Sequence, residues 1–204
     1  MTDGPIGLNL GQPVPDFTLT TFEPSTGGFG EANLETLKKD GKWTVLVFYP
    51  ADFTFVCATE FAALADAQDR LAAMGAKVIT VSTDTQFTHM AWQREEKELA
   101  PVKYSMGADP TGAISQLFGV YDCNSGLALR GTFIISPEGT LTNSEVNFYN
   151  LGRNMDELER KLKANIYLAK NGAEVCPAKW TNDGDKTLTP GPDLVGRVHE
   201  ALNG

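Results

Sequence analysis

Two runs rich in β-branched and aromatic residues stand out in the first half of the chain, at Trp43–Tyr49 and Ala76–Ser82. Runs with so few polar positions predict strands that are buried on both faces. Between them, apolar residues recur with the 3.6-residue period of a helix over Thr59–Met74, and Gly75 then supplies a stop signal. A strand, a helix and a second strand in this order predict a parallel crossover.

The pattern on either side of this unit predicts further elements. The lead-in over residues 1–15 contains three prolines, Asp16–Thr21 alternates like a strand, and Phe22–Gly30 has the composition of a loop or hairpin end. After the second buried strand, apolar periodicity and turn residues predict these helices and strands in chain order: helix Gln86–Leu99 closed by Pro101, helix Ala113–Phe118, strand Thr132–Ser136, strand Leu141–Tyr149 and a helix capped by Asn154.

This order of elements predicts an α/β protein with a thioredoxin-like, three-layer fold and a mixed central sheet. The core is expected at about residues 40–170. We expect one domain over residues 1–170, including an N-terminal extension, and a C-terminal tail over residues 171–204 that carries Cys176.

Charge and composition restrict the partners. The 204 residues carry a net charge of −9. An acidic surface repels phosphate backbones and anionic lipids, so we expect neither a nucleic-acid nor a membrane partner. No apolar run approaches the ~20 residues that span a bilayer. Met1–Gly11 lacks the basic and apolar segments of a signal peptide, so we expect a cytoplasmic location.

The three cysteines, Cys57, Cys123 and Cys176, are too few for a disulfide scaffold and odd in number. Together with His89 and His199 they form no spacing typical of a metal site, so we expect no bound metal. In a reducing compartment, cysteines that do form disulfides are usually catalytic and form them transiently.

Cys57 has the most informative surroundings. Pro50 ends the first buried strand, a short loop follows, and a helix begins near Thr54, so the thiol is expected in the first turn of that helix. The positive end of a helix favours the thiolate, which is the nucleophilic form of cysteine. Pro50 lacks an N–H and has a fixed φ, so we expect it to close one side of the pocket and exclude water.

Donors aimed at a developing negative charge contribute more to the rate than ionisation does, at roughly 10²–10³ per donor. Thr54 lies three residues before Cys57, which places its hydroxyl on the same helix face as the sulfur. Arg130, at the end of a strand, would supply a permanent positive charge. A thiolate between these donors and the free N–H groups of a helix start suits attack on an O–O bond.

Simpler interpretations of these residues remain open. Thr54 could be only a helix cap, a role that is compatible with contact to a substrate. Arg130 could be a surface arginine or half of an ion pair. Glu60 could be the partner of Arg130 or could only favour the start of its own helix, and it is a secondary site candidate.

The chain closely resembles the peroxiredoxins. Pro50-x-x-x-Thr54-x-x-Cys57 matches their active-site signature, and Arg130 begins an Arg-Gly-x-Phe-Ile-Ile segment like theirs. Glu174–Trp180 resembles the segment of the resolving cysteine in typical two-cysteine members. The resemblance covers about residues 8–200 and is nearest to the bacterial alkyl hydroperoxide reductase C group.

This resemblance implies a thiol-dependent peroxidase for hydrogen peroxide and alkyl hydroperoxides, active in antioxidant defence. Cys57 would be oxidised to a sulfenic acid, and Cys176 of the partner subunit would condense with it into an intersubunit disulfide. The resemblance also implies reduction by a flavoprotein disulfide reductase or a thioredoxin-like protein. It implies no metal, haem or flavin in the chain, and a homodimer that assembles into a decameric ring.

The chain departs from the family pattern in three places. Ala58 replaces the proline that usually follows the cysteine, which is expected to loosen the first helical turn slightly. The segment Glu95–Pro101 lacks the Gly-Gly-Leu-Gly insertion of easily overoxidised members, and the tail after Trp180 has no Tyr-Phe pair. We therefore expect a mobile C-terminus, quick disulfide formation and resistance to overoxidation.

Three other functions compete with a peroxidase. A thiol-disulfide oxidoreductase would need a second cysteine close to the first, but Cys57–Glu60 reads Cys-Ala-Thr-Glu. A Cys-His hydrolase would use His89 as its base, although a packed or solvated histidine fits the pattern of its helix better. A holdase chaperone built from rings would retain its activity in a Cys57→Ser variant. Cys123 lies in turn-forming sequence and is interpreted as a bystander thiol.

Overall fold

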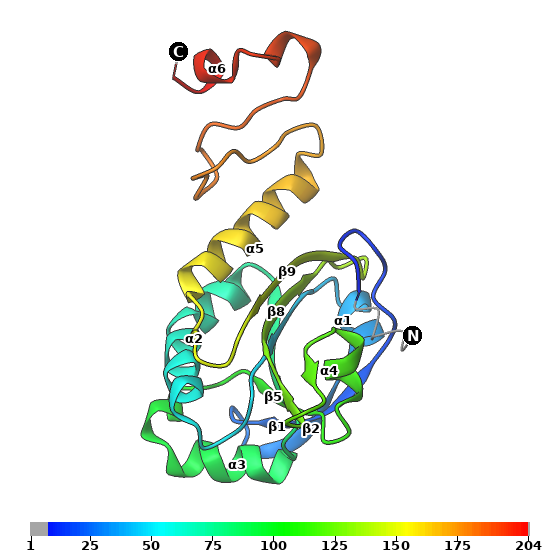
Figure 1. Ribbon diagram of the computed structural model, residues 1–204, viewed down its shortest axis with the longest axis vertical. Helices are drawn as coiled ribbons and strands as arrows, with labels where there is room; N and C mark the ends of the chain where they lie inside the picture. The colour runs from blue at the N-terminus through cyan, green and yellow to red at the C-terminus, as the bar shows by residue number, and fades with distance from the viewer. Residues whose placement is uncertain (1–7, 204) are drawn as a thin grey trace. The chain divides into compact units, whose positions relative to one another are not determined.

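The computed structural model describes residues 8–203, which contain both strands and helices (Figure 1). The strands are β1 (Thr18–Glu23), β2 (Gly28–Asn33), β3 (Trp43–Phe48), β4 (Ala76–Ser82), β5 (Ser105–Ala108), β6 (Tyr121–Asp122), β7 (Leu127–Ala128), β8 (Arg130–Ile135) and β9 (Leu141–Asn147). The helices are α1 (Leu34–Lys39), α2 (Phe55–Ala73), α3 (Gln86–Glu95), α4 (Ala113–Leu117), α5 (Met155–Lys170) and α6 (Val198–Asn203), with 3₁₀ turns at Lys97–Leu99 and Pro192–Leu194.

The chain divides into two compact units, Met1–Met155 and Asp156–Gly204. The first contains the strands and α1–α4, and the second contains most of α5, the segment after it and α6. Residue 170, where the sequence predicts the end of the first domain, is the last residue of α5, and this domain division stays a prediction. The part of the predicted lead-in that falls on residues 1–7 lies outside the described residues.

The large sheet has the strand order β2-β1-β5-β4-β3-β8-β9. Its inner strands β3, β4 and β5 run parallel, while β1, β2, β8 and β9 join antiparallel to their neighbours. Every residue of β3 is buried, as its apolar sequence predicts for a central strand. The sheet is therefore mixed, and the predicted α/β class is correct.

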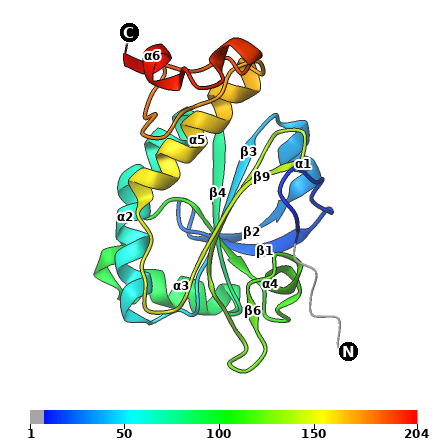
Figure 2. The same cartoon turned by 45° about the horizontal axis from the view of Figure 1, so that its top comes forward.

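Helices cover both faces of the sheet in the first unit, with α2 and α3 on one face and α1 and α4 on the other (Figure 2). The side chains of β3 alternate between the two faces. Leu46 and Phe48 belong to an apolar cluster that includes Leu34 of α1. Tyr49, directly after β3, packs its ring on Phe61 of α2 at a centroid distance of 4.8 Å. The strand thus fixes where the following loop and α2 begin.

The structure corrects several predicted elements. The helix predicted over Gln86–Leu99 ends at Glu95, because Glu96 is extended (φ −89°, ψ 116°) and a separate 3₁₀ turn follows. The segment Phe22–Gly30, predicted as a loop or hairpin end, contains the end of β1 and the start of β2, which pair in a hairpin, so the second alternative is correct.

Strand β5 and helix α1 have no counterpart in the prediction. β5 is four residues long and consists mostly of small residues, so its sequence lacks the usual strand signal. It is nevertheless fully buried, and a Cβ at Gly107 would approach the backbone oxygen of Thr80 to 3.2 Å. The close packing of neighbouring strands, rather than local propensity, therefore defines this element.

Candidate active site

Cys57 is the third residue of α2 and has no exposed surface. The residue before the helix, Thr54, is extended (φ −114°, ψ 156°), and the N–H of Ala58 donates to its carbonyl oxygen at 3.2 Å. The N–H groups ahead of Ala58 belong to the helix start, where no intrahelical acceptor exists. The predicted placement of the sulfur in the first turn of a helix after a central strand is confirmed.

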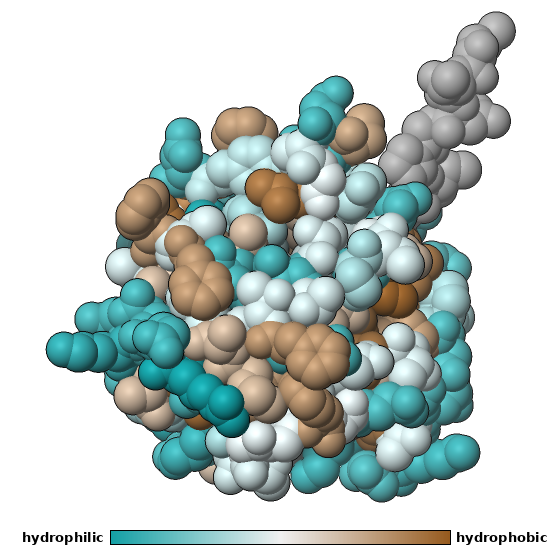
Figure 3. All heavy atoms as spheres, turned by 90° about the horizontal axis from the view of Figure 1, so that it is seen from below, coloured by the Kyte–Doolittle hydropathy of each residue, from teal (hydrophilic) through white to brown (hydrophobic). Residues whose placement is uncertain are grey.

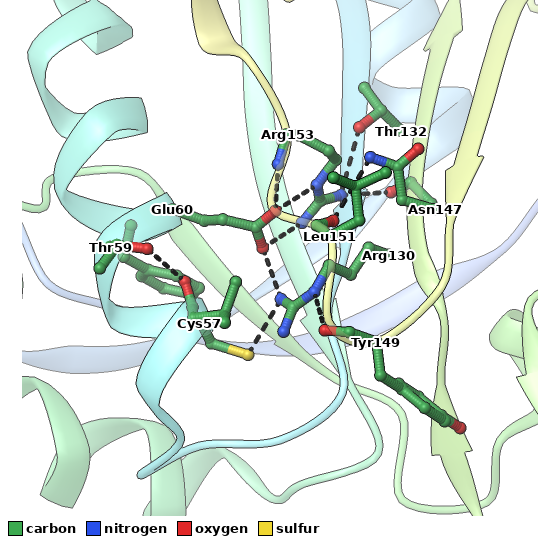
Figure 4. A network of polar contacts seen from close by, with 12 residues as sticks. Cys57, Thr59, Glu60, Arg130, Thr132, Asn147, Tyr149, Leu151 and Arg153 are labelled. Atoms are coloured by element: carbon green, nitrogen blue, oxygen red, sulfur yellow. Dashed lines mark hydrogen bonds and ion pairs between the residues drawn. The ribbon is translucent and has the colours of Figure 1, made fainter.

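Arg130, the first residue of β8, lies beside this sulfur. Its Nη1 is 3.3 Å from Cys57 Sγ and 2.7 Å from Glu60 Oε2, while its Nε donates to the carbonyl oxygen of Tyr149 at 2.7 Å (Figure 4). The side chain is 4% exposed, so the interpretation as a surface arginine is wrong. The alternative of an ion pair with Glu60 is correct, and the same guanidinium also reaches the sulfur.

A second arginine, Arg153, completes a buried group that we call the Glu60 cluster: Glu60, Arg130 and Arg153. The guanidinium of Arg153 donates from Nε to Glu60 Oε1 at 2.9 Å and from Nη2 to Oε2 at 2.8 Å. Its backbone N–H also donates to Oε1 at 2.9 Å. Its Nη1 holds β8 through the Gly131 carbonyl at 2.9 Å and the Thr132 hydroxyl at 3.2 Å (Figure 4).

Arg153 was not among the residues predicted from the sequence. It stands 93 positions from Glu60, so no local spacing links the two residues. The available signal was indirect: Arg153 is the one basic residue between Arg130 and Arg160, and a glutamate on the buried face of a helix requires a cationic partner.

The charges of the Glu60 cluster do not cancel. Two guanidinium groups face one carboxylate, which leaves one positive charge in a buried site. Burial alone would raise the pKa of Glu60, but the hydrogen bonds and charge of Arg153, together with the charge of Arg130, hold it below its ordinary value. The carboxylate therefore stays ionised, and an anionic Cys57 sulfur would bring the group to neutrality.

Thr54 and Pro50 flank the helix start. Thr54 occupies the N-cap position, but its side chain makes no capping hydrogen bond and instead donates to the Ala51 carbonyl oxygen at 2.7 Å. Because the hydroxyl proton is used in this bond, the oxygen keeps lone pairs that can accept a hydrogen bond from another group. Pro50 is buried at the end of the strand, and its role in closing the pocket stays a prediction.

Cys176 lies in the second compact unit, in the segment after α5, and is half-buried. Burial raises the pKa of its thiol above the ordinary value, and the nearby charge of Arg160 opposes this shift. Cys123 is exposed in the turn between β6 and β7, and all three cysteines are free.

Within residues 8–203 no group of three His, Cys, Asp or Glu side chains is arranged to hold a metal ion. In the same range, none of the helices combines the length and apolar character that crossing a bilayer requires.

Comparison with known proteins identifies the family. The model of the AhpC/TSA family matches residues 10–144, which include Cys57, Thr54 and Arg130. This chain belongs to the AhpC/TSA family. Alkyl hydroperoxide reductase C of Staphylococcus aureus strain Mu50 is 46% identical over 182 residues, which are 89% of this chain and 95% of that protein.

Solved structures of AhpC/TSA relatives agree with this assignment. The crystal structure of Enterococcus faecalis AhpC is 39% identical and has a TM-score of 0.78 over 82% of this chain and 98% of its own. Reduced 2-Cys peroxiredoxin from Plasmodium vivax is 31% identical, with a TM-score of 0.84 over 91% of this chain and 95% of its own. The predicted resemblance to two-cysteine peroxiredoxins and the thioredoxin-like fold are confirmed.

Proposed function

We propose that this chain is a thiol-dependent peroxidase that reduces hydrogen peroxide and alkyl hydroperoxides at Cys57. The observation that carries the proposal is the 3.3 Å contact between Arg130 Nη1 and Cys57 Sγ in a buried site with one uncompensated positive charge. This arrangement places a permanent cation beside the sulfur and supplies the donors that a breaking O–O bond needs.

In the proposed first step, the Cys57 thiolate attacks the terminal oxygen of the peroxide. A sulfur–oxygen bond forms, the O–O bond breaks, and the electron pair leaves on the second oxygen, which takes up a proton to give water or an alcohol. Sulfur is oxidised to a sulfenic acid while the peroxide is reduced by two electrons. Arg130 and the N–H groups of the helix start stabilise the charge on the leaving oxygen.

Thr54 would orient the peroxide in this step. Since its hydroxyl proton is directed to the Ala51 carbonyl, its oxygen can accept a hydrogen bond from the O–H of a hydroperoxide. A donor to the leaving oxygen on one side and an acceptor for the terminal O–H on the other would hold the substrate in line for attack.

The sulfenic acid would then condense with Cys176 of a second copy of the chain. The Cys176 sulfur attacks Cys57 sulfur, a disulfide forms, and the hydroxyl leaves as water, so oxidation states and atoms balance. A flavoprotein disulfide reductase or a thioredoxin-like protein would supply two electrons to regenerate both thiols. We expect this cycle to run in the cytoplasm, where such reductants keep thiols reduced.

Resolution by a second copy requires at least a homodimer, and we propose assembly into a ring of five dimers. The first unit exposes large aromatic side chains near α3, with Phe87 64%, Phe53 55% and Phe29 47% exposed. Phe29 and Phe87 pack together at a centroid distance of 5.1 Å. Figure 3 views this side from below and shows brown, hydrophobic side chains among polar ones. Exposed apolar surface of this kind supports an interface between copies.

Non-reducing electrophoresis after one equivalent of hydrogen peroxide tests both cysteine roles. We expect a covalent dimer in the wild type that is absent from the Cys57→Ser and Cys176→Ser variants. Cys123→Ser is the matched control, because Cys123 is free and exposed, and it should form the dimer normally. A peroxide-dependent dimer that persists without Cys57 or without Cys176 would contradict the proposal.

The geometry disfavours the competing hydrolase. Both ring nitrogens of His89 are engaged, Nδ1 with Asp52 Oδ2 at 2.7 Å and Nε2 with the Gly107 carbonyl oxygen at 3.2 Å. A histidine with neither nitrogen directed at the thiol cannot act as its base. A chaperone activity could coexist with the peroxidase and is distinguished by its persistence in Cys57→Ser.

A further inference from the structure

A second group of buried polar side chains lies just before α2, the helix that carries Cys57, and the proposed mechanism does not use it. Asp52 is in the loop between β3 and α2, and its Oδ1 accepts a hydrogen bond from the Tyr49 hydroxyl at 2.6 Å. Its Oδ2 is 2.7 Å from His89 Nδ1 on α3. The side chains of His89 and Asp52 are 0% and 1% exposed, respectively. Burial of this kind is costly unless every group has a partner.

The protons of this group can be assigned from its acceptors. The Gly107 carbonyl can only accept, so His89 Nε2 carries a proton and donates to it. Burial, followed by the charge of Asp52, raises the pKa of Tyr49, so its hydroxyl stays protonated and donates. One further proton is then shared between His89 Nδ1 and Asp52 Oδ2. Whichever atom holds it, the histidine–aspartic acid pair is neutral as a whole and fully hydrogen-bonded.

The backbone of Asp52 is held as well. Its N–H donates to Asp84 Oδ2 at 2.9 Å, and Ser82, at the end of β4, donates its hydroxyl to the same oxygen at 2.7 Å. We call Tyr49, Asp52, Asp84 and His89 the Asp52 cluster. Its hydrogen bonds connect Asp52, in the loop before α2, to the end of β3, to the segment after β4 and to α3.

The residue after Asp52 has an unfavourable backbone. Phe53 has φ of 57°, in the left-handed region that bulky side chains rarely adopt, and is followed by Thr54 and the helix of Cys57. Its ring packs on Trp92 of α3 at a centroid distance of 6.3 Å. A strained residue persists only where neighbouring contacts hold it, and the Asp52 cluster is the adjacent set of such contacts.

We propose that Asp52 is a positioning residue that holds the Cys57 loop closed, and that the Asp52 cluster sets how fast this loop opens for disulfide formation. The inference rests on the proposed function. Cys57 has no exposed surface, so its sulfenic acid must leave the closed site before a second sulfur can reach it. Opening of the loop that carries Asp52 must break the hydrogen bonds of this side chain to Tyr49 and His89. Release of the strain at Phe53 favours that opening.

A single-turnover experiment on the pre-reduced full-length protein separates the two steps. One equivalent of hydrogen peroxide is added, the reaction is quenched by acid, and the Cys57–Cys176 disulfide is quantified by mass spectrometry over time. The variants are Asp52→Ala, which removes both carboxyl oxygens, and Tyr49→Phe, which removes one donor and keeps the packed ring. Asp69→Ala is the matched control, because Asp69 is exposed and pairs at the surface with Lys103.

We expect the first-order disulfide step to accelerate about tenfold in Asp52→Ala and about threefold in Tyr49→Phe, because the first change removes two buried hydrogen bonds and the second removes one. The Asp69→Ala control should match the wild type. Hydrogen exchange should accelerate over residues 50–58 while β8 keeps its protection. The localised exchange distinguishes loop opening from general loss of stability.

A disulfide step at the wild-type rate or slower in folded Tyr49→Phe would overturn the inference, even if Asp52→Ala failed to fold. Faster exchange in β8 to the same extent as in the loop would overturn it too. These outcomes differ from failure of the proposed function, in which the wild type itself would form no Cys57–Cys176 disulfide.

Discussion

Replacement of Glu60 by glutamine tests the buried charges beside Cys57 most directly. In the wild type, the carboxylate accepts from Arg130 Nη1 at 2.7 Å and from Arg153 Nη2 at 2.8 Å. Glutamine keeps the shape but carries no charge, and its NH₂ group would face one of the two guanidinium groups. The variant therefore leaves two buried cations with one neutral acceptor.

The expected loss of stability follows from this geometry. The side chains of Glu60, Arg130 and Arg153 are all at most 4% exposed, so solvent screens the lost attraction only weakly. Removing one partner from a buried ion pair typically costs about 3–5 kcal/mol. For a chain of this size, that loss corresponds to a decrease in Tm of roughly 6–20 °C.

Activity should decrease as well. Without the carboxylate, Arg130 Nη1 loses the charged acceptor that directs it toward Cys57 Sγ, although Arg130 Nε still donates to the Tyr149 carbonyl oxygen. A displacement of about 1 Å at a reacting centre can lower a rate by about 10²-fold. We expect the second-order rate constant for peroxide to fall by about one to two orders of magnitude.

Thermal unfolding of the reduced protein and stopped-flow oxidation measure the two effects. Glu35→Gln is the matched control, since Glu35 pairs with Lys38 at 2.6 Å but is 44% exposed. A surface pair of this kind contributes at most about 1 kcal/mol. If Glu60→Gln melted within about 2 °C of Glu35→Gln, a shift worth less than about 1 kcal/mol, a stabilising role for the buried charges would be refuted.

Four further measurements test the same site. Thr54→Val keeps the shape of the side chain but removes the oxygen that would accept a hydrogen bond from the peroxide O–H, so the oxidation rate should fall about 10²-fold while Tm changes little; an unchanged rate would exclude that role. Arg130→Lys keeps the charge but loses the planar guanidinium that contacts Cys57 Sγ, Glu60 and the Tyr149 carbonyl oxygen. Loss of about one strong hydrogen bond should lower the oxidation rate constant at least tenfold in stopped-flow kinetics. The pKa of Glu60 is lowered by folding, so the stabilisation that its carboxylate provides is present above the ordinary value of 4.5 and is lost as pH falls through the lower, folded value. The free energy of unfolding should therefore decrease less steeply with falling pH in Glu60→Gln than in the wild type. Equal slopes for the two proteins would contradict a lowered pKa. With reductant cycling, about one equivalent of peroxide should leave Cys57 free of sulfinic acid by mass spectrometry, and its appearance would show that resistance to overoxidation is wrong.

Local sequence signals predicted the parts of the site that lie close together along the chain. The strand, the loop and the helix start around Cys57 follow one another within a few residues, and each has its own pattern. Arg130 was found through its position at a strand end and its matching segment, and its contact with Glu60 was one of two alternatives.

Pairings between distant residues could not be predicted in the same way. Arg153 meets Glu60 across 93 positions, and His89 meets Asp52 across 37. The pattern of its helix indicated only that His89 is packed or solvated, and the structure shows it buried between a carboxyl group and a carbonyl oxygen. Such contacts depend on how the sheet orders its strands, and β5, which carries that carbonyl, has too weak a strand signal to be predicted.

The surplus cation beside Cys57 has a consequence for chemical damage. A sulfenic acid is neutral, so once Cys57 has reduced a peroxide, two guanidinium groups face one carboxylate with no second anion. A sulfinate would restore electrical balance in that dry space, and the same field that prepares the enzyme for its first oxidation therefore favours the irreversible second one. Under repeated exposure to peroxide, the survival of the enzyme then depends on two rates: the sulfenic acid must form its disulfide faster than a second peroxide molecule reaches it.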